Sequence, residues 1–379
     1  MKLLLYVLLF VITTPLLTAQ YYPGTTEWEN RSPTAVNLNA DSLAAAVFFA
    51  EDHEYSGERD LRLAILKSFR REPEHGLKGP TKERGGPAGI ILKDGYIVAQ
   101  WGDVGRVDMT FSVTKSYLST TAGLAFDDGL IGTVNQPVKD YVWDGTFSGD
   151  HNATITWEHL LHQTSDWSGS LFGLADWADR PDRNTGFDDW RYRKLHAPGT
   201  HFKYNDVRVN LLAYSLLQVW RKPLPQVLKE RVMDPIGASG TWRWFGYDDA
   251  WVTLDGTKMQ SVSGGGHHGG GVFINTLDQA RMGLLFARAG NWAGRQLISE
   301  RWVEMVQTPT PANPNYGYMW WLNRPGPRHW AGVPEHVYYA AGFGGNFIVV
   351  DEQRDLVIVT RWLEPAEIGA FVRRVYGAL

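Results

Sequence analysis

The sequence predicts an α/β fold of the α+β type. One antiparallel sheet flanked by helices is built from N- and C-terminal segments, and a mainly helical domain is inserted between them. Two observations lead to this prediction. Strand-like segments occur near residue 90 and again after residue 315, towards opposite ends of the 379-residue chain. Between about residues 112 and 280, apolar residues instead recur with helical periodicity.

The first residues have the organisation of a secretory signal peptide. Lys2 precedes an apolar stretch from Leu3 to Ile12, and the small residue Ala19 follows at a suitable cleavage position. A membrane anchor is the weaker alternative, because a spanning helix needs ~20 apolar residues. We expect residues 1–19 to be a signal peptide, the mature chain to make no stable membrane insertion, and the protein to be periplasmic or secreted. The sequence contains no Cys, which excludes a lipoprotein anchor.

The first half of the predicted sheet domain contains one helix and one hairpin. The segment 41–55 has helical spacing of apolar residues, with Asp41 or Ser42 as a possible N-cap. The segment 89–103 consists of two β-rich runs around Asp94-Gly95, a pair that suits a two-residue turn because both positions need positive φ. We therefore expect a helix followed by a hairpin.

Apolar periodicity also predicts the remaining helices and strands. Asp278 is the expected N-cap of a helix that begins near Gln279. Helices are expected at 118–130, 207–220, 223–233 and 365–379, and strands within 316–362. The predicted divisions are an N-terminal lead-in at 20–37, the α/β domain's first part at 38–111, a mainly helical domain at 112–275 with the helix that carries Ser112 at the interface, and the α/β domain's second part at 276–379.

Composition excludes several classes of protein. With 44% hydrophobic and 21% charged residues, the chain is neither disordered nor fibrous. A formal net charge of −4 gives no basic footprint, so we expect no nucleic-acid partner. The absence of Cys removes disulfides, thiolate metal sites and a Cys nucleophile.

One motif carries the chemistry of a nucleophile. Ser112 and Lys115 form the only S-x-x-K pattern of the chain. Residues three apart share a helix face, so the Lys115 amine can reach the Ser112 hydroxyl and act as its base where the environment favours the neutral amine. The alternative is a capping serine with a solvated lysine. The chain has no G-x-S-x-G, H-E-x-x-H or Walker motif.

Three further segments are candidates for a functional role. Tyr204 precedes an amphipathic helix, although a lone tyrosine is usually a packing residue. The glycine-rich run 340–345 lies between two strand-like segments, where missing side chains would let a substrate approach the backbone, or would mark a bulge. The run 264–269 matches G-x-G-x-x-G, but a strand-like segment follows where a dinucleotide site needs a helix, so we interpret it as a flexible loop.

Taken together, these segments resemble the serine β-lactamase and penicillin-binding-protein superfamily, specifically its class C-like branch. That branch contains family VIII carboxylesterases, D-aminopeptidases and 6-aminohexanoate-dimer hydrolases. The resemblance covers nearly all of the mature chain and implies a β-lactamase-like fold. The segments that carry it are MTFSVTKSYLST, TWEHLLHQTSDW, FKYNDVRVNLL, GGGVFINTLDQARMGLLFARAGNWAGRQLISERW, NYGYMWW and YYAAGFGGNFIVVDEQRDLVIV.

The resemblance implies a role for each motif residue. Ser112 would be the acylated nucleophile, Lys115 its base partner, and Tyr204 the group that passes a proton to the leaving atom. The backbone N–H groups of Ser112 and of Phe343, the residue after Gly342, would form the oxyanion hole. The family implies no metal and no organic cofactor.

The sequence departs from the family pattern at two positions. Asp206 stands where β-lactamases have an amide side chain, which makes its usual substrate contact doubtful. The third motif reads Ala340-Ala341-Gly342 and lacks the lysine that attracts a substrate carboxylate. A carboxylate would lose its cation and meet Asp206 instead, so a neutral ester or amide is favoured. Arg361 or the pair His267-His268 could still supply positive charge.

Other conspicuous residues have two readings each. His267-His268 suggests a metal, yet no third ligand lies at suitable spacing, and we expect none. His162 is expected to be a structural hydrogen-bonding residue. Tryptophans near the motifs could wall a substrate site or pack in the core, and Trp167 is the one we select as a substrate-binding residue. The others are Trp177, Trp190, Trp242, Trp244, Trp320 and Trp321.

The sequence therefore predicts an exported serine hydrolase that works through a Ser112 acyl-enzyme. Carboxylesterase activity on small neutral esters, extending to amides, is the first expectation. β-Lactamase or D-amino-acid peptidase activity is the alternative within the same chemistry. A slowly deacylating penicillin-binding sensor is the alternative of another class.

Overall fold

A six-stranded antiparallel sheet forms the centre of the protein. The computed structural model describes residues 20–182 and 184–379, so the predicted signal peptide lies outside the described residues. The strand order is β11-β12-β13-β14-β1-β2. The strands are β1 (Ala88–Lys93), β2 (Tyr96–Trp101), β11 (Trp321–Leu322), β12 (Tyr338–Gly342), β13 (Asn346–Asp351) and β14 (Leu356–Arg361).

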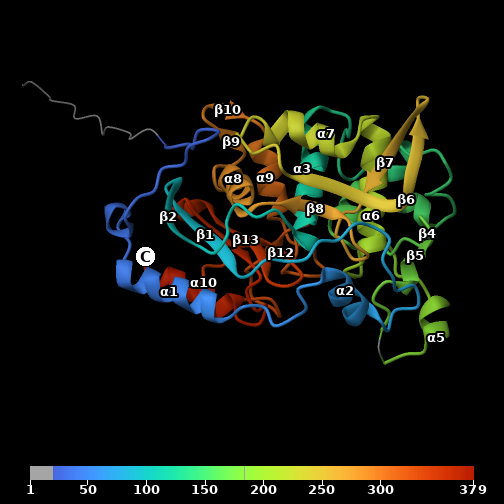
Figure 1. The fold of residues 1–379 in the computed structure, drawn as a ribbon. Helices are drawn as coiled ribbons and strands as arrows, with labels where there is room; N and C mark the ends of the chain where they lie inside the picture. The colour runs from blue at the N-terminus through green and yellow to red at the C-terminus, as the bar shows by residue number, and fades with distance from the viewer. Residues whose placement is uncertain (1–19, 183) are drawn as a thin grey trace, which may run out of the picture.

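Strands from the two ends of the chain lie side by side in this sheet. β1 pairs with β14 in a register that joins Ala88 to Arg361 and Lys93 to Leu356, and Figure 1 shows these blue-green and red strands together. β1 also forms the predicted hairpin with β2, and Asp94 and Gly95 at its turn have φ values of 54° and 84°. The predicted antiparallel sheet of N- and C-terminal segments is therefore confirmed.

Helices cover both faces of the sheet, as the alternation of its apolar side chains requires. Ile91 packs with α1 (Ala40–Asp52) and α10 (Ile368–Tyr376) on one face. Ile90 belongs to the larger core on the other face, where α8 (Thr276–Ala287) packs. Figure 1 shows α1 and α10 side by side below the sheet.

Two helix starts differ from the sequence prediction. The side chain of Asn39 caps α1 by accepting a hydrogen bond from Ser42 N, so neither Asp41 nor Ser42 is the cap. Asn275 caps α8 by accepting from Asp278 N. Asp278 instead accepts hydrogen bonds from the backbone and hydroxyl of Ser239. An asparagine just upstream offers the same capping oxygen, and the sequence pattern does not separate the two choices.

The inserted region contains helices and a second sheet. Its helices are α3 (Thr114–Asp127), α4 (Trp157–Leu161), α5 (Phe187–Arg191), α6 (Asp206–Trp220) and α7 (Leu224–Leu228), which continues into a π-helical turn at Lys229–Met233. A four-stranded sheet in the order β3-β8-β6-β7 packs beside them. Its strands are β3 (Asp108–Met109), β6 (Arg243–Leu254), β7 (Thr257–Val262) and β8 (Gly271–Ile274). Residues 243–274 are thus largely β-structure within a region expected to be mainly helical.

Short elements complete the fold. They are α2 (Leu61–Phe69), α9 (Glu300–Val306), β4 (Ser170–Leu171), β5 (Leu174–Ala175), β9 (Asn291–Trp292) and β10 (Arg295–Gln296). None of the helices within the described parts of the chain has the length and apolar character to cross a membrane.

Candidate active site

Ser112 lies in a 3₁₀ turn, η2 (Phe111–Val113), between β3 and α3. Phe111 has a φ of 51°, a conformation that costs energy for a non-glycine residue and that the surrounding packing must hold. Lys115 lies one turn further on, and its Nζ donates a hydrogen bond to Ser112 Oγ at 2.9 Å. Lys115 is buried and Ser112 is half-buried, so the serine is the member of the pair that a substrate can reach.

The amine of Lys115 has a second partner, Asp206 at the start of α6. Lys115 Nζ lies 2.7 Å from Asp206 Oδ1, and each of the two side chains is only 2% exposed. Gly265 lies against this pair so closely that a Cβ there would overlap both Lys115 Nζ and Asp206 Oδ1. The run 264–269 is therefore a buried part of the site, not the flexible loop that its glycines suggested.

Tyr204 lies over the same lysine. The centre of its ring is 4.6 Å from Lys115 Nζ, and the ring stacks on Trp321 at 5.7 Å between centroids. Asn205 follows as the N-cap of α6, where its side chain accepts from Arg208 N at 3.0 Å. The middle residue of the predicted Tyr-Asn-Asp motif therefore serves the helix, while Tyr204 and Asp206 on either side of it face Lys115.

A cavity of about 630 Å³ opens over Ser112 and Tyr204. Its wall is largely aromatic, with one arginine inside and one at the rim. Other lining residues are Tyr55, Phe69, Phe111, Arg180, Phe202, Trp321, Arg328, Gly342, Phe343 and Phe347. Such a wall can hold an apolar acyl or alcohol group next to the serine hydroxyl.

The end of β12 lies directly against the nucleophile turn. A Cβ at Gly342 would be 3.3 Å from Ser112 N and would overlap Thr110 O, so only glycine fits there. Phe343, the next residue, lines the cavity, and its ring packs 4.9 Å from that of Phe111. The backbones of Ser112 and Phe343 thus border one cavity, and their pairing as an oxyanion hole stays a prediction.

Two predicted substrate residues are not cavity residues. Trp167 is 2% exposed in the core, where its Nε1 donates to Thr146 O at 3.0 Å. It lies close to the motifs in sequence, but its ring points into the inserted region and Trp321 forms the aromatic wall instead. Asp206 is covered by Lys115 and Arg180, so it is a partner of the lysine rather than part of the wall.

Arg180 is a site residue that no sequence motif revealed. It lies in the loop after Trp177, and its NH1 is 2.6 Å from Asp179 Oδ1 and 2.7 Å from Asp206 Oδ2. Its guanidinium carbon also lies 5.3 Å from the centre of the Tyr204 ring. Burial acts to raise the pKa of Asp206, but the positive charges of Lys115 and Arg180 outweigh it and hold that pKa well below its ordinary value.

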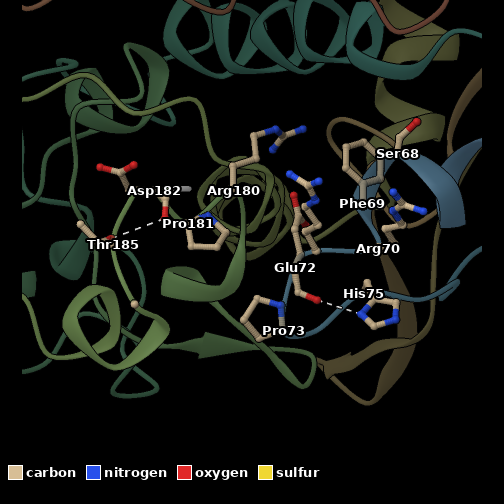
Figure 2. Close-up of a pocket in the computed structure, with 12 residues that line it drawn as sticks. Ser68, Phe69, Arg70, Glu72, Pro73, His75, Arg180, Pro181, Asp182 and Thr185 are labelled. Carbon is tan, nitrogen blue, oxygen red and sulfur yellow. Dashed lines mark hydrogen bonds between the residues drawn. The ribbon is translucent and has the colours of Figure 1, made fainter.

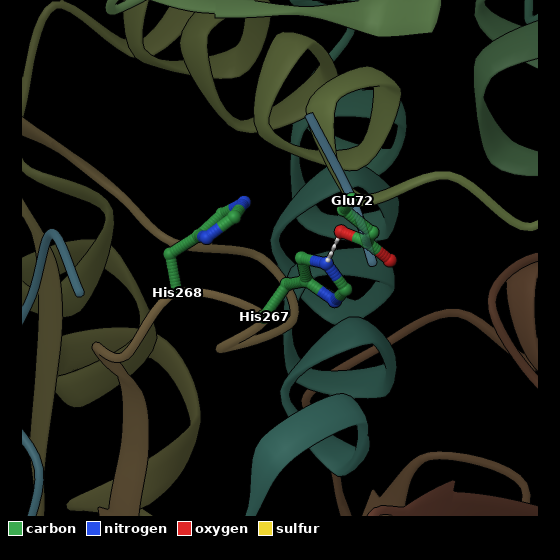
Figure 3. A group of neighbouring side chains, drawn as sticks. All are labelled: Glu72, His267 and His268. Carbon is green, nitrogen blue, oxygen red and sulfur yellow. Dashed lines mark hydrogen bonds and ion pairs between the residues drawn. The ribbon is translucent and has the colours of Figure 1, made fainter. Parts of the chain in front are cut away.

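A buried histidine lies behind Arg180. His267 Nδ1 is 2.8 Å from an Arg180 nitrogen, and His267 Nε2 is 2.6 Å from Glu72 Oε2 (Figure 3). A guanidinium only donates hydrogen bonds, so His267 Nδ1 must accept one from Arg180. The ring proton is then on Nε2, which donates a hydrogen bond to Glu72. His267 is therefore a neutral imidazole with both nitrogens engaged.

The same cluster contains atoms that could ligate a metal. Glu72, His267 and His268 have ligand atoms within 4.8 Å of one another, so Glu72 supplies the third ligand that sequence spacing did not reveal. Burial lowers the pKa of His268 to about 4, which leaves it neutral. A cation bound there would have to displace the His267 Nε2 proton beside the positive charge of Arg180, so the chemistry of this donor set disfavours one.

Arg361 does not supply charge to the cavity. Its guanidinium is buried and donates to Ile274 O at 2.9 Å and Met109 O at 3.1 Å. Arg328 at the rim lies over the Trp321 ring at 4.6 Å. A second cavity of about 760 Å³ shares Phe69 and Arg180 with the first, and Figure 2 shows Arg180 and Glu72 among the residues that line it.

Comparison with known proteins identifies the family. The sequence model of the β-lactamase family matches residues 81–361, which include every residue of the Ser112 site described above except Tyr55, Phe69 and Glu72. The chain belongs to the β-lactamase family. The resemblance predicted from the motifs is confirmed, and the serine hydrolase chemistry of this family agrees with the contact between Lys115 and Ser112.

Relatives within this family have diverse activities. The chain is 25% identical to the 6-aminohexanoate-dimer hydrolase of Paenarthrobacter ureafaciens over 362 residues, which covers 85% of this chain and 83% of the relative. It shares its fold with a penicillin-binding protein homologue from Caulobacter crescentus, with a TM-score of 0.57, 14% identity and coverage of 86% and 99% of the two chains. A family VIII carboxylesterase matches with a TM-score of 0.56, 16% identity and coverage of 84% and 96%.

His162 has the structural part expected of it. Its Nε2 lies 3.1 Å from Thr308 O, and burial lowers its pKa, so it is a neutral residue that ties two segments together. It is not among the residues that line the cavity over Ser112.

Proposed function

We propose that the protein is an exported carboxylesterase that cleaves small neutral esters through an acyl-enzyme on Ser112. The observation that carries this proposal is the 2.9 Å contact between Lys115 Nζ and Ser112 Oγ beside a cavity with an aromatic wall. Amides are the second substrate class in this proposal, since the 25% identical relative is named for hydrolysis of a 6-aminohexanoate dimer.

The balance of charge around Ser112 favours a neutral substrate. The two cations that contact Asp206 are already paired, the buried Lys115 with Asp206 and the half-buried Arg180 with both Asp179 and Asp206. The third motif has Ala340 where related enzymes that bind a substrate carboxylate have lysine. Among the described residues that line this cavity, Arg328 at the rim is the one arginine not paired with a carboxylate, and a carboxylate placed beside Ser112 would meet the negative field of Asp206.

The residues support a two-step reaction. Ser112 Oγ bonds to the acyl carbon while its proton passes to Lys115 Nζ and the carbonyl π electrons move to oxygen. The carbonyl re-forms, the bond to the alcohol oxygen breaks, and Tyr204 relays a proton to that oxygen. Water then repeats the attack on the acyl-enzyme, the acid leaves, and Ser112 regains its proton. The backbone N–H groups of Ser112 and Phe343 stabilise the negative oxygen in both steps.

Export is part of the proposal. Its support is the signal-like organisation of residues 1–19, with Lys2 before an apolar stretch and Ala19 at its end. Expression of the full chain in a bacterium, followed by N-terminal sequencing of the periplasmic protein, tests it. A mature N-terminus at Gln20 is expected, and an uncleaved chain in the cytosol contradicts it.

Parallel progress curves test the activity. The mature protein is given a short p-nitrophenyl ester and, separately, a chromogenic cephalosporin, with Ser112→Ala as the blank. Rapid turnover of the ester that disappears in Ser112→Ala is the expected result. Ester turnover that survives in Ser112→Ala contradicts the whole scheme.

Arg328 makes β-lactamase or D-amino-acid peptidase activity the second candidate. It is an exposed cation at the rim of the cavity over Ser112, and it could hold a substrate carboxylate there. Cephalosporin cleavage that exceeds ester turnover and falls in Arg328→Gln would favour this candidate. A stoichiometric burst with no steady state would instead indicate a slowly deacylating sensor.

A further inference from the structure

We propose that Arg180 is a positioning residue that lets Lys115 work as a base. By sharing the Asp206 carboxylate with Lys115, Arg180 weakens the hold of Asp206 on the ammonium form of the lysine. This inference rests on the proposed Ser112 hydrolase function, and it assigns a part in that reaction to a residue outside the family motifs.

Two cations share the carboxylate of Asp206. Its Oδ1 lies 2.7 Å from Lys115 Nζ, and its Oδ2 lies 2.7 Å from Arg180 NH1. The Asp206 side chain is only 2% exposed, so water screens these charges little. A lone carboxylate at this distance would keep Lys115 charged, and a charged lysine cannot accept the proton of Ser112.

Of the two cations that contact Asp206, Arg180 is the one that stays charged. Guanidinium groups keep their proton in proteins, whereas an amine can lose it. Negative partners hold the pKa of Arg180 above its ordinary value, against the effect of burial. When Lys115 is neutral, Asp206 still has Arg180 as its counter-ion, so the cluster tolerates the neutral lysine that the reaction needs.

Two neighbouring side chains fix the position of the Arg180 guanidinium. Asp179 Oδ1 lies 2.6 Å from its NH1, and His267 Nδ1 accepts from its NH2 at 2.8 Å. His267 Nε2–H donates a hydrogen bond to Glu72 Oε2 (Figure 3), which leaves the lone pair on Nδ1, the nitrogen that contacts Arg180. Asp179 also accepts a hydrogen bond from Asp206 N. Asp179 and His267 thus hold Arg180 in line with Asp206, and Glu72 supports His267.

Among the described residues, the charged and titratable groups around Lys115 and Asp206 fit this arrangement. The charged groups and the imidazole are Glu72, Asp179, Arg180 and His267, and the phenols are Tyr204, Tyr247 and Tyr316. Burial raises the pKa of Tyr247 and of Tyr316, so these two phenols stay neutral in the pH range of an assay. Asp206 is therefore the carboxylate in contact with Lys115, and Arg180 is the second cation in contact with Asp206.

The proton balance of the reaction uses both states of the lysine. Neutral Lys115 accepts the Ser112 proton as Oγ bonds to the acyl carbon, and the ammonium that forms is then stabilised by Asp206. The proton leaves with the alcohol by way of Tyr204, and Lys115 is neutral again. Arg180 gives and takes no proton, so it acts only through its charge and its place beside Asp206.

Opposite shifts of the pH–rate profile test the proposal. We would measure kcat/KM for a p-nitrophenyl ester from pH 5 to 9 at the isosbestic wavelength of p-nitrophenol, with the Ser112→Ala rate subtracted. Arg180→Gln should move the pH of half-maximal activity up by about one unit, which is a tenfold loss on the acidic limb. Asp206→Asn should move it down. Arg180→Lys, whose amine can itself lose a proton, should move it up less than Arg180→Gln.

Matched variants separate charge balance from general damage. Arg71→Gln removes an exposed arginine of the second cavity that does not touch Asp206, and its profile should not move. Glu72→Gln keeps an oxygen for His267 Nε2 and should shift the profile less than His267→Phe, which removes the acceptor of Arg180. Dialysis against a chelator should leave every profile unchanged.

The outcomes distinguish two failures. If Ser112→Ala keeps the activity, the proposed function fails. If activity depends on Ser112 but the folded Arg180→Gln enzyme has the same acidic limb as the wild type, the inference alone is overturned. Should Arg180→Gln fail to fold, His267→Phe takes its place: an upward shift supports the proposal and an unmoved limb overturns it.

Discussion

Two buried clusters of charge begin at the same turn of α6 and differ in what they can do. The reactive cluster consists of Ser112, Lys115, Arg180, Tyr204 and Asp206. The structural cluster consists of Asp166, Asp176, Arg193 and Arg208. An Arg208 nitrogen lies 2.8 Å from Asp166 Oδ1 and 2.8 Å from Asp176 Oδ2, and the Arg208 side chain is 1% exposed. Asp206 and Arg208, two residues apart, thus belong to different clusters.

The difference lies in the kind of cation and in access. Both cations of the structural cluster are arginines, which bind carboxylates through fixed forks and do not lose a proton. The reactive cluster replaces one arginine by a lysine that touches a serine, and it borders a cavity. Paired charges are buried in both clusters, so burial alone does not identify a reactive site. The feature that identifies one is a cation that can give up its proton next to a nucleophile.

Removal of the reactive lysine should have the largest effect on the rate. Lys115→Ala should lower kcat by about 10² to 10⁴, the usual contribution of a base. The matched variant is Lys203→Met: burial lowers the pKa of Lys203 to about 8, but its Nζ donates to Asp179 O at 2.8 Å. Steady-state kinetics should show a kcat within several-fold of the wild type for Lys203→Met. Equal losses in both variants would remove the distinction between the lysines.

Removal of the structural arginine should act on stability instead. Arg208→Met leaves Asp176 without its buried partner, and breaking a buried pair costs about 3–5 kcal/mol. Urea unfolding followed by tryptophan fluorescence measures this loss, and active-site titration gives kcat per folded molecule. A normal stability with a strongly reduced kcat per folded molecule would contradict the division into two clusters.

Acid should weaken the structural cluster. Burial acts to raise the pKa of Asp166, but Arg193 and Arg208 outweigh it and the pKa lies well below its ordinary value. The folded state therefore binds this proton less readily than the unfolded state. The ionised Asp166 therefore contributes its full stabilisation of the folded state above the ordinary Asp pKa of about 4. This stabilisation is lost as the pH falls towards the pKa of Asp166 in the folded state.

Unfolding curves at pH 6, 4 and 3 measure this effect. Asp166→Asn should lessen the loss of stability between pH 6 and 3 by about 1 kcal/mol. Asp60, an exposed carboxylate bonded to Arg62, provides the matched variant Asp60→Asn, whose effect should be smaller. If the pH dependence of Asp166→Asn equals that of the wild type, the ion pairs of Asp166 contribute nothing to acid sensitivity.

The smallest effect should distinguish two tryptophans, one beside each cluster. Trp321 stacks on Tyr204 in the cavity, so Trp321→Phe should change KM for aryl esters several-fold. Trp167, next to Asp166, is buried in the core, so Trp167→Phe should lower the melting temperature and leave KM unchanged. A KM change confined to Trp167→Phe would restore that residue to the substrate site.

The parts of the fold that could be predicted carry local signals. Asp94-Gly95 predicts its hairpin because a tight turn needs two positive φ values, and the structure has them. The same signal at Asp255-Gly256, with φ values of 50° and 78°, joins β6 to β7 within a region that was expected to be mainly helical. Of the inserted sheet, only the strand-like segment after residue 269, which is β8, was noted from the sequence.

The residues of the candidate site also divide into those that carry a sequence signal and those that do not. Ser112, Lys115 and Tyr204 could be predicted because family motifs mark them. Arg180 could not, and His267 was singled out only as a source of charge or a metal ligand, because the reactive cluster and its support are assembled from distant loops and only tertiary packing brings them together. Trp167 was misassigned for a related reason: neighbours in sequence on an irregular segment need not face the same side.

The order of strands in the central sheet also governs when this protein can fold. β1 lies between β2 and β14, and β14 ends only at Arg361. During synthesis, one edge of the apolar β1–β2 hairpin therefore lacks its native neighbour until nearly the whole chain has been made. Pairing over such a long separation is slow, and an unpaired strand edge invites association between chains. Newly made chains should depend on chaperones until their last strand arrives.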